Sequence, residues 1–408
     1  MTEVEEKKFI SNLKQNSRSQ KIDLKGLDFP TSKSEFWKYT RTGKITNQVF
    51  SNVKSNKLQA SVIEKYLEGY SEYIVFVNGS YNQDLSKFNA QFININTQIK
   101  NDQNIGKLTN AKDHIFSAIN MNYFTDGVHV KVEKNVQLQN PILILHIASE
   151  PDAASILHHN INVQANSSVN FVFKTVNANS EEKSHFNIVN EIVAEENAHV
   201  QCFTIQEPNA QTSIIETTDV SIEKNANYSS FYISTGGNII RNNINVKLNG
   251  EGAETHLYGL TLAKGKSHID HHTLIDHRVP NCPSNEMYKT IVDDSATGVF
   301  NGKVFVRPDA QKTNAFQSSQ GILLSDRANI YAKPELEIYA DDVKCSHGST
   351  TGQLDEEAKF YLKSRGIGED IANKMLIKAF LVEVLDEIKN ETTKNAFEDI
   401  IEQYFQTS

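Results

Sequence analysis

Cysteine is scarce in this 408-residue sequence, and its scarcity excludes several kinds of site. Cys202, Cys282 and Cys345 lie far apart and form no CxxC pair, so the chain alone cannot supply a four-thiolate iron–sulfur cluster or a zinc knuckle. An odd and sparse set of thiols also disfavours a disulfide framework and favours a reducing compartment. The N-terminal stretch MTEVEEKKFISNLKQ is charged and lacks the apolar core of a secretory signal, so we expect a cytoplasmic protein.

Long apolar runs and basic clusters are absent too. No stretch approaches the roughly 20 apolar residues that span a bilayer, so we expect no membrane segment. The formal net charge is −9, and Lys and Arg form no block, which argues against nucleic-acid binding. The Gly-Lys-Ser at 265–267 lies one position out of step with Gly259 for a phosphate-binding loop, so we expect no ATP hydrolysis by this chain alone.

From about residue 125 the sequence shows a loose repeat of alternating strands. In four successive stretches a strand leads into a turn of Asn or Gly and then into another strand. These turns begin at Asn166, Asn197, Asn225 and Gly252, with separations of 31, 28 and 27 residues. A strand repeat of this length is typical of a solenoid, and Asn suits its corners because it tolerates left-handed backbone. The pattern predicts a β-helix, with an antiparallel β-sandwich as the alternative.

Helical patterns flank the repeat on both sides. Before it we predict helices at 62–70 and 113–124 around a strand that enters an Asn-Gly turn, and after it helices at 355–367, 369–389 and 394–405. We therefore expect a mainly β protein with three domains. These are an N-terminal α/β or helical domain (1–124), a β-helix core (125–350) and a C-terminal helical domain (351–408).

The long helix predicted at 369–389 carries more apolar surface than one surface helix needs. One stripe is Ile371, Met375, Ala379, Val382 and Leu385, and a second is Ile377, Leu381, Val384 and Ile388. Two interpretations remain open. Either the helix is clamped between its own domain and the helix that follows, or one stripe docks a partner.

A histidine-rich stretch forms a first candidate metal site. It contains His268, His271, His272 and His277, with Cys282 shortly beyond. Clustered imidazoles can hold zinc or iron, but this spacing matches no compact motif, and adjacent histidines in a strand face opposite ways. The alternative is a polar ladder or an interface.

The stretch DDVKCSHGST at 341–350 forms a second candidate site. If residues 339–347 form a strand, Cys345 and His347 share one face with Cα atoms roughly 6.5–7 Å apart, so both could reach one ion. Zinc or cluster iron usually has four ligands, and the missing ones would come from elsewhere in the fold, from inorganic sulfide or from another subunit. A nucleophile with its base and a plain buried thiol remain alternatives.

Residues 298–367, from GVFNGKVFVRPD to FYLKSRGI, closely resemble the SufB/SufD family of iron–sulfur cluster assembly proteins. The stretch EFWKYT at 35–40 resembles a Trp-Lys-Tyr-Thr signature of the SufD branch. SufB proteins carry a Glu-His-Glu-Ala-type stretch where this chain has Cys-Ser-His-Gly at 345–348. The chain therefore resembles SufD more than SufB.

The resemblance implies a fold, partners and a role. The fold would be a right-handed parallel β-helix between helical terminal domains. The chain would pair with SufB and dock the ATPase SufC through 351–408, which makes Phe360, Tyr361, Arg365 and Met375 docking candidates. His347 would be a ligand of iron or a nascent cluster at the SufB interface, and Cys345 would ligate or tune the same site. The isolated chain would bind no cofactor stably.

This role is that of a non-catalytic scaffold, without nucleic-acid or membrane partners. One alternative is a homodimeric metal-binding scaffold formed when the chain is alone. Another is a β-helical enzyme acting on polysaccharide, for which the sequence shows no cluster of acidic, calcium-binding and basic groups.

Overall fold

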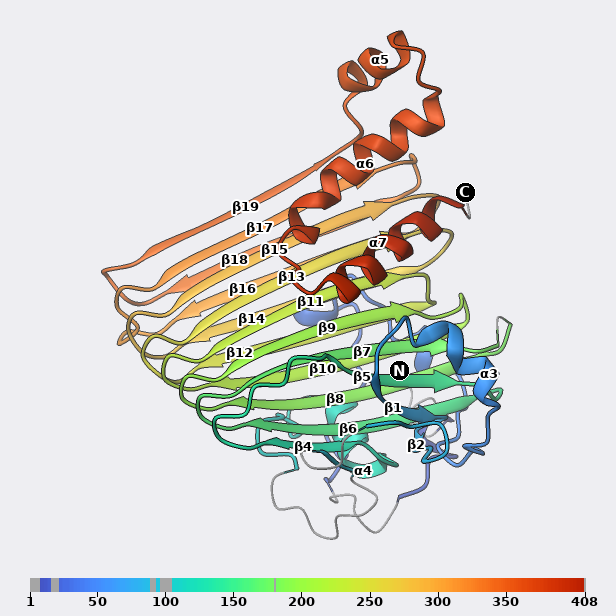
Figure 1. Cartoon of the computed structure of the whole chain (residues 1–408), viewed down its shortest axis with the longest axis vertical. Coiled ribbons are helices and arrows are strands. Elements are labelled where there is room, and N and C mark those ends of the chain that lie inside the picture. The colour runs from blue at the N-terminus through green and yellow to red at the C-terminus, as the bar shows by residue number, and fades with distance from the viewer. Residues whose placement is uncertain (1–7, 16–21, 89–92, 96–104, 180, 407–408) are drawn as a thin grey trace.

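The computed structural model describes residues 8–15, 22–88, 93–95, 105–179 and 181–406. Strands make up the largest share of these residues, and they form two long sheets that face each other across a flattened coil (Figure 1). From β4 onward the chain alternates between the sheets, so that each turn adds one strand to each of them. The mainly β prediction and the parallel β-helix are both confirmed, and helices lie at both ends.

The two sheets are named by their size. The ten-stranded sheet consists of β1 (Glu72–Val77), β2 (Ser80–Tyr81), β5 (Ile142–Ala148), β7 (Ser168–Asn177), β9 (His199–Glu207), β11 (Asn227–Thr235), β13 (Glu254–Ala263), β15 (Pro283–Val292), β17 (Asn314–Leu323) and β19 (Lys344–Gly352). The nine-stranded sheet consists of β3 (Ile93–Ile95), β4 (Val128–Val132), β6 (Ala153–Val163), β8 (Ser184–Ala194), β10 (Thr212–Ile222), β12 (Ile239–Leu248), β14 (His268–His277), β16 (Thr297–Val306) and β18 (Asn329–Ile338).

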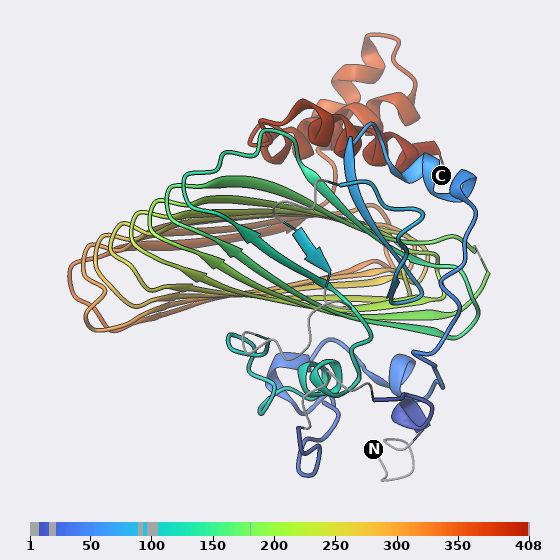
Figure 2. The same ribbon diagram turned by 60° about the horizontal axis from the view of Figure 1, so that its bottom comes forward.

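The helical elements lie before and after most of these strands. The N-terminal ones are η1 (Glu35–Trp37), α2 (Gly43–Thr46), α3 (Ala60–Ile63), η2 (Glu64–Tyr66) and α4 (Ile115–Tyr123), and the C-terminal ones are α5 (Glu356–Ser364), α6 (Glu369–Leu385) and α7 (Glu391–Gln406). Figure 2 shows α6 and α7 on one side of the coil and α4 on the opposite side. Leu381 and Phe397 pack on outward side chains of the ten-stranded sheet, and Phe116 packs on those of the nine-stranded sheet. Both sheets are therefore covered on part of their outer faces.

Asparagines turn the corners of the coil, as predicted. Asn166, Asn197 and Asn225 have φ values of 62°, 58° and 54°, and Gly252 has 75°. The Asn197 amide donates to the Asn166 side-chain oxygen at 2.9 Å, and Asn166 donates in the same way to Asn135 at 3.0 Å. The corner residues thus bond from rung to rung in addition to adopting left-handed backbone.

The Asn197→Ala variant is expected to lower the free energy of unfolding by about 1–3 kcal/mol, because left-handed backbone is costly for alanine and one side-chain hydrogen bond is lost. Urea unfolding of the full chain would measure this difference. Asn197→Gly is the matched control, since it loses the same bond without the backbone penalty. Equal losses in the two variants would contradict the role of backbone conformation.

The coil starts and ends in different ways. At its start, β1 and β2 form the predicted hairpin, with Asn78 and Gly79 at φ 50° and 83°, and β1 also pairs with β5 in parallel. At its end, the strand predicted at 339–347 begins later, at Lys344, and runs to Gly352. Among the described residues, no strand pairs with the outer edges of β18 and β19. The domain limits at 124 and 350 stay predictions.

None of the helices in the described ranges has the length and apolar character needed to cross a membrane.

Candidate functional site

Cys345 and His347 lie on β19, at the open end of the coil. They are in register with Ala315 and Gln317 of β17, which are both buried. Because in-register side chains of neighbouring strands project to the same face, Cys345 and His347 continue two inward-facing columns to the last rung. Their common face is confirmed. Cys345 is half-buried and packs with Ala315, whereas His347 is exposed.

The Cys345 thiol has a protonated resting state. Burial raises its pKa, an effect that the backbone N–H of Ala315 partly offsets. An activated nucleophile needs a lowered pKa, so this environment argues against that interpretation. A bound metal ion would displace the proton, because thiols coordinate metals as thiolates. The two side chains therefore suit metal coordination better than nucleophilic attack.

The donor set at this end of the coil is incomplete for one ion. Within the part of the chain that the structure describes, no group of three or more His, Cys, Asp or Glu side chains could hold a metal. One imidazole and one thiol would fill half of a tetrahedral coordination sphere. The remaining ligands would have to come from outside the described residues.

The histidine-rich strand β14 does not gather its side chains at one point. His271 and His277 point inward and are buried, and His277 contacts the Ser284 hydroxyl at 3.0 Å. His268 and His272 point outward, as the alternation predicted. Cys282 is buried in the following turn, where its thiol contacts the Gly250 carbonyl. A metal role for these five residues stays a prediction, and the structure gives most of them other partners.

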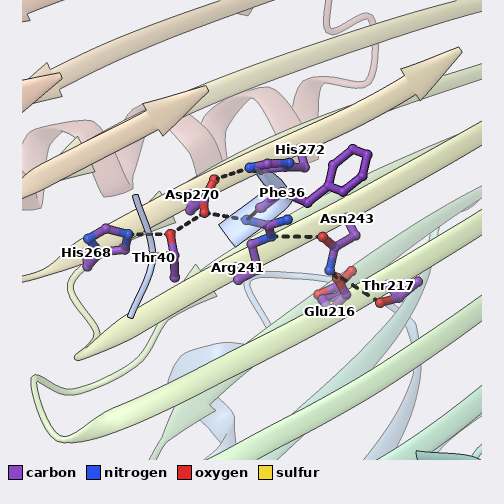
Figure 3. Close-up of polar contacts among 9 residues, drawn as sticks. All are labelled: Phe36, Thr40, Glu216, Thr217, Arg241, Asn243, His268, Asp270 and His272. Atoms are coloured by element: carbon purple, nitrogen blue, oxygen red, sulfur yellow. Dashed lines mark hydrogen bonds and ion pairs between the residues drawn. The ribbon is translucent and has the colours of Figure 1, made fainter. Parts of the chain in front are cut away.

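The outward histidines belong to a buried polar network around Asp270 (Figure 3). Asp270 accepts hydrogen bonds from Arg241 at 2.6 Å and from Thr40, and it lies 3.2 Å from His272. Because the Thr40 hydroxyl donates to Asp270, it accepts from Nε2–H of His268 at 2.7 Å. Burial lowers the pKa of both His268 and His272, so both imidazoles are neutral at pH 7.

This network gives a structural role to the stretch EFWKYT at 35–40. The Arg241 guanidinium lies 4.4 Å from the Trp37 ring centroid and donates to the Phe36 carbonyl at 2.9 Å. The stretch is thereby fixed to the outer face of the nine-stranded sheet. Tyr39 also stacks on Tyr331 of β18, at 4.4 Å between centroids, which ties the N-terminal segment to the last rung. Sequence reasoning identified the motif but gave no role for its residues.

The two apolar stripes of α6 have different fates. Ile377, Leu381, Val384 and Ile388 are buried in the cluster that includes the ten-stranded sheet. On the other stripe Ile371, Met375 and Val382 are exposed, whereas Leu385 is buried in the same cluster as the first stripe. Phe360 and Tyr361 of α5 are exposed as well. Arg365 donates to the Tyr361 hydroxyl at 2.9 Å. We call this exposed set, with Arg365, the helical apolar face. This exposed face is compatible with the interpretation that one stripe of the helix docks a partner.

Exposed apolar side chains also surround the open end. The large ones are Phe316, Tyr331, Ile338 and Tyr339. They lie on or beside β17, β18 and β19, close to the unpaired strand edges. Apolar side chains next to free backbone donors and acceptors are typical of a surface that another chain covers.

Comparisons with known proteins agree with this architecture. Residues 146–380 match the family model "SUF system FeS cluster assembly, SufBD core domain". An iron–sulfur cluster assembly SufBD family protein of Synechocystis sp. is 31% identical, over 91% of this chain and 87% of its own length. The iron–sulfur cluster assembly protein SufD of Escherichia coli is 29% identical over 90% and 86%, and that of Bacillus subtilis is 24% identical over 98% and 94%.

The chain belongs to the SufB/SufD family of iron–sulfur cluster assembly proteins. Relatives that carry the name SufD align over nearly its whole length, so within this family the chain is SufD-like.

Proposed function

We propose that this chain is a scaffold subunit that pairs with SufB through the open end of its β-helix and presents His347 as a ligand for iron or a nascent cluster. One observation supports this proposal: the last rung combines strand edges that no other described strand pairs with and, on one face, an exposed imidazole and a half-buried thiol. The iron or cluster is the cargo of the assembly. SufB would supply the ligands that are missing among the described residues.

The helical apolar face supports a second part of the proposal, that α5 and α6 dock the ATPase SufC. Its exposed aromatic and aliphatic side chains are separated from the stripe that holds α6 on the sheet. ATP hydrolysis would then occur on SufC, and this chain would be non-catalytic.

Co-expression tests the proposed assembly. The tagged chain, produced with SufB and SufC of the same organism and purified without oxygen, is expected to elute as a complex that contains all three proteins. Mass measurement with and without SufB distinguishes a complex with SufB from a homodimer of this chain. A homodimer that persists when SufB is present would overturn the pairing and favour a homodimeric scaffold.

Met375→Glu is expected to weaken SufC binding by at least about tenfold, because Met375 is 45% exposed within the helical apolar face and a charge there would have to be desolvated on docking. Titration with purified SufC would measure the dissociation constant. Val53→Glu is the matched control, since Val53 is an exposed apolar residue outside this face. Unchanged affinity in the Met375 variant would contradict docking here.

A further inference from the structure

A buried carboxyl group lies inside the coil, two rungs from the open end. Glu286 on β15 is fully buried, and burial raises its pKa to about 7, partly offset by Thr273 and Gln317. No ion pair with a cation stabilises it within the described residues. Its Oε2 accepts a hydrogen bond from the Gln317 side-chain amide. Neither Glu286 Oε1 nor Gln317 Oε1 has a hydrogen-bond partner, although both are buried.

Strand register connects this pair to the candidate ligand. Glu286 pairs with Gln317 across β15 and β17, and Gln317 pairs with His347 across β17 and β19. In-register side chains on adjacent strands share a face and stand about 4.8 Å apart. The three residues therefore form one column that leads from the buried interior to the exposed imidazole.

A glycine leaves space for the middle member of the column. A Cβ atom on Gly302 of β16 would overlap the Gln317 amide nitrogen and the Phe300 ring. Gly302 has no left-handed backbone that would by itself require glycine. Its missing side chain thus provides room for the Gln317 amide, which is seated against the opposite sheet.

The chemistry of the pair fixes the direction of that amide. Above its pKa the Glu286 carboxylate is ionised and only accepts hydrogen bonds, so the Gln317 NH₂ group then faces Glu286 and its Oε1 faces away. The imidazole of His347 is the next side chain in the column and carries an N–H donor. If that N–H donates to Gln317 Oε1, the other ring nitrogen is unprotonated and free to bind a metal.

We propose that Gln317, held by Glu286 and accommodated by Gly302, is a positioning residue that fixes the tautomer and orientation of His347. The inference depends on the proposed function only for the purpose of this positioning, because Glu286, Gln317 and His347 all belong to this chain and the contact needs no partner protein. In metal sites, partners of this kind typically change affinity by about 10- to 100-fold.

The experiment measures the tautomer directly in the full, metal-free chain. With ¹⁵N-labelled histidine, nuclear magnetic resonance above pH 8 reports which ring nitrogen is protonated, and the His347→Ala variant assigns the signal. The wild-type chain is expected to show one tautomer at His347, and Gln317→Leu is expected to show a mixture. A mixture in the wild type, or one unchanged tautomer in Gln317→Leu, would overturn the inference.

Two further variants guard against a simple loss of folding. The exchange of both residues, Glu286→Gln with Gln317→Glu, keeps the buried hydrogen bond and an acceptor at position 317, so it is expected to restore the single tautomer. Gly302→Ala keeps every polar group but displaces the amide, so it is expected to give the mixture. Failure of the exchange variant to restore the single tautomer while it remains folded counts against the proposal.

The proposed function can fail independently. If the tautomer responds as expected but His347→Ala leaves cluster assembly intact in the complex, the positioning of His347 by Gln317 is supported and its role as a ligand is contradicted. If His347→Ala abolishes assembly but all variants show the same tautomer, only the positioning of His347 by Gln317 is contradicted.

Discussion

His347→Ala is expected to lower cluster assembly by the complex of this chain with SufB and SufC by about tenfold or more. The reason is that the described residues form no group of three or more potential ligands, and the exposed imidazole shares its face of the last rung with Cys345. Even groups that only support a ligand typically change metal affinity about 10- to 100-fold, so removal of a ligand is expected to cost at least as much. Iron and acid-labile sulfide per complex, after anaerobic reconstitution, measure the effect.

The same substitution is expected to leave the fold and the SufC affinity unchanged, because the His347 side chain is exposed. His199→Ala is a matched control, since His199 is an exposed histidine on another strand of the same sheet. Equal cluster loading in the His347 variant, the control and the wild-type complex would contradict a role for His347 as a ligand.

Asp270→Ala is expected to lower the free energy of unfolding by about 3–5 kcal/mol, because it leaves the guanidinium of Arg241 buried without its counter-charge. The side chains of Arg241 and Asp270 are only 2% and 1% exposed. Removal of the carboxylate also takes away the acceptor for Thr40, which helps to hold the N-terminal segment on the sheet. Chemical unfolding of the full chain measures the loss.

The effect of Asp270 should depend on pH in a defined direction. Burial opposes ionisation of Asp270, yet Arg241 and His272 hold its pKa well below the ordinary value. A carboxyl with a depressed pKa stabilises the fold above its unfolded pKa of about 3.9, and this contribution is lost as the pH falls further. The difference between wild type and Asp270→Ala should therefore be full at pH 7 and shrink below about pH 4.

Asp276→Ala is the matched control for this prediction. Asp276 pairs with Arg278 and Arg307, whose side chains are far more exposed than that of Arg241. Exposed ion pairs contribute about 1 kcal/mol or less, so the control should cost much less than Asp270→Ala. Similar decreases in the free energy of unfolding in the two variants would show that burial of Arg241 does not determine the size of the effect.

The parts of the fold that follow from local rules could be predicted from the sequence. Asn166, Asn197 and Asn225 indicated the corners, because few residues other than Asn and Gly adopt left-handed backbone at low cost. The alternation of side chains in a strand placed Cys345 and His347 on one face, whichever sheet the strand joined. The same rule separated adjacent histidines on β14.

The parts that depend on rung register could not be predicted. Thr40 and Asp270 are 230 residues apart, and no local pattern links them. The column of Glu286, Gln317 and His347 arises only when turns of unequal length bring three strands into one alignment. A buried Glu without a cationic neighbour in sequence gives no signal until its surroundings are known.

The uncapped last rung has a consequence for how cells make this protein. Strand edges without neighbours are templates on which other strands can add, and proteins usually shield them. On β18 and β19 a shield would also block the surface proposed for assembly. If the proposed pairing is correct, a copy made in excess of its partner would be prone to associate with other excess copies through these edges, so balanced synthesis of the two proteins would limit aggregation.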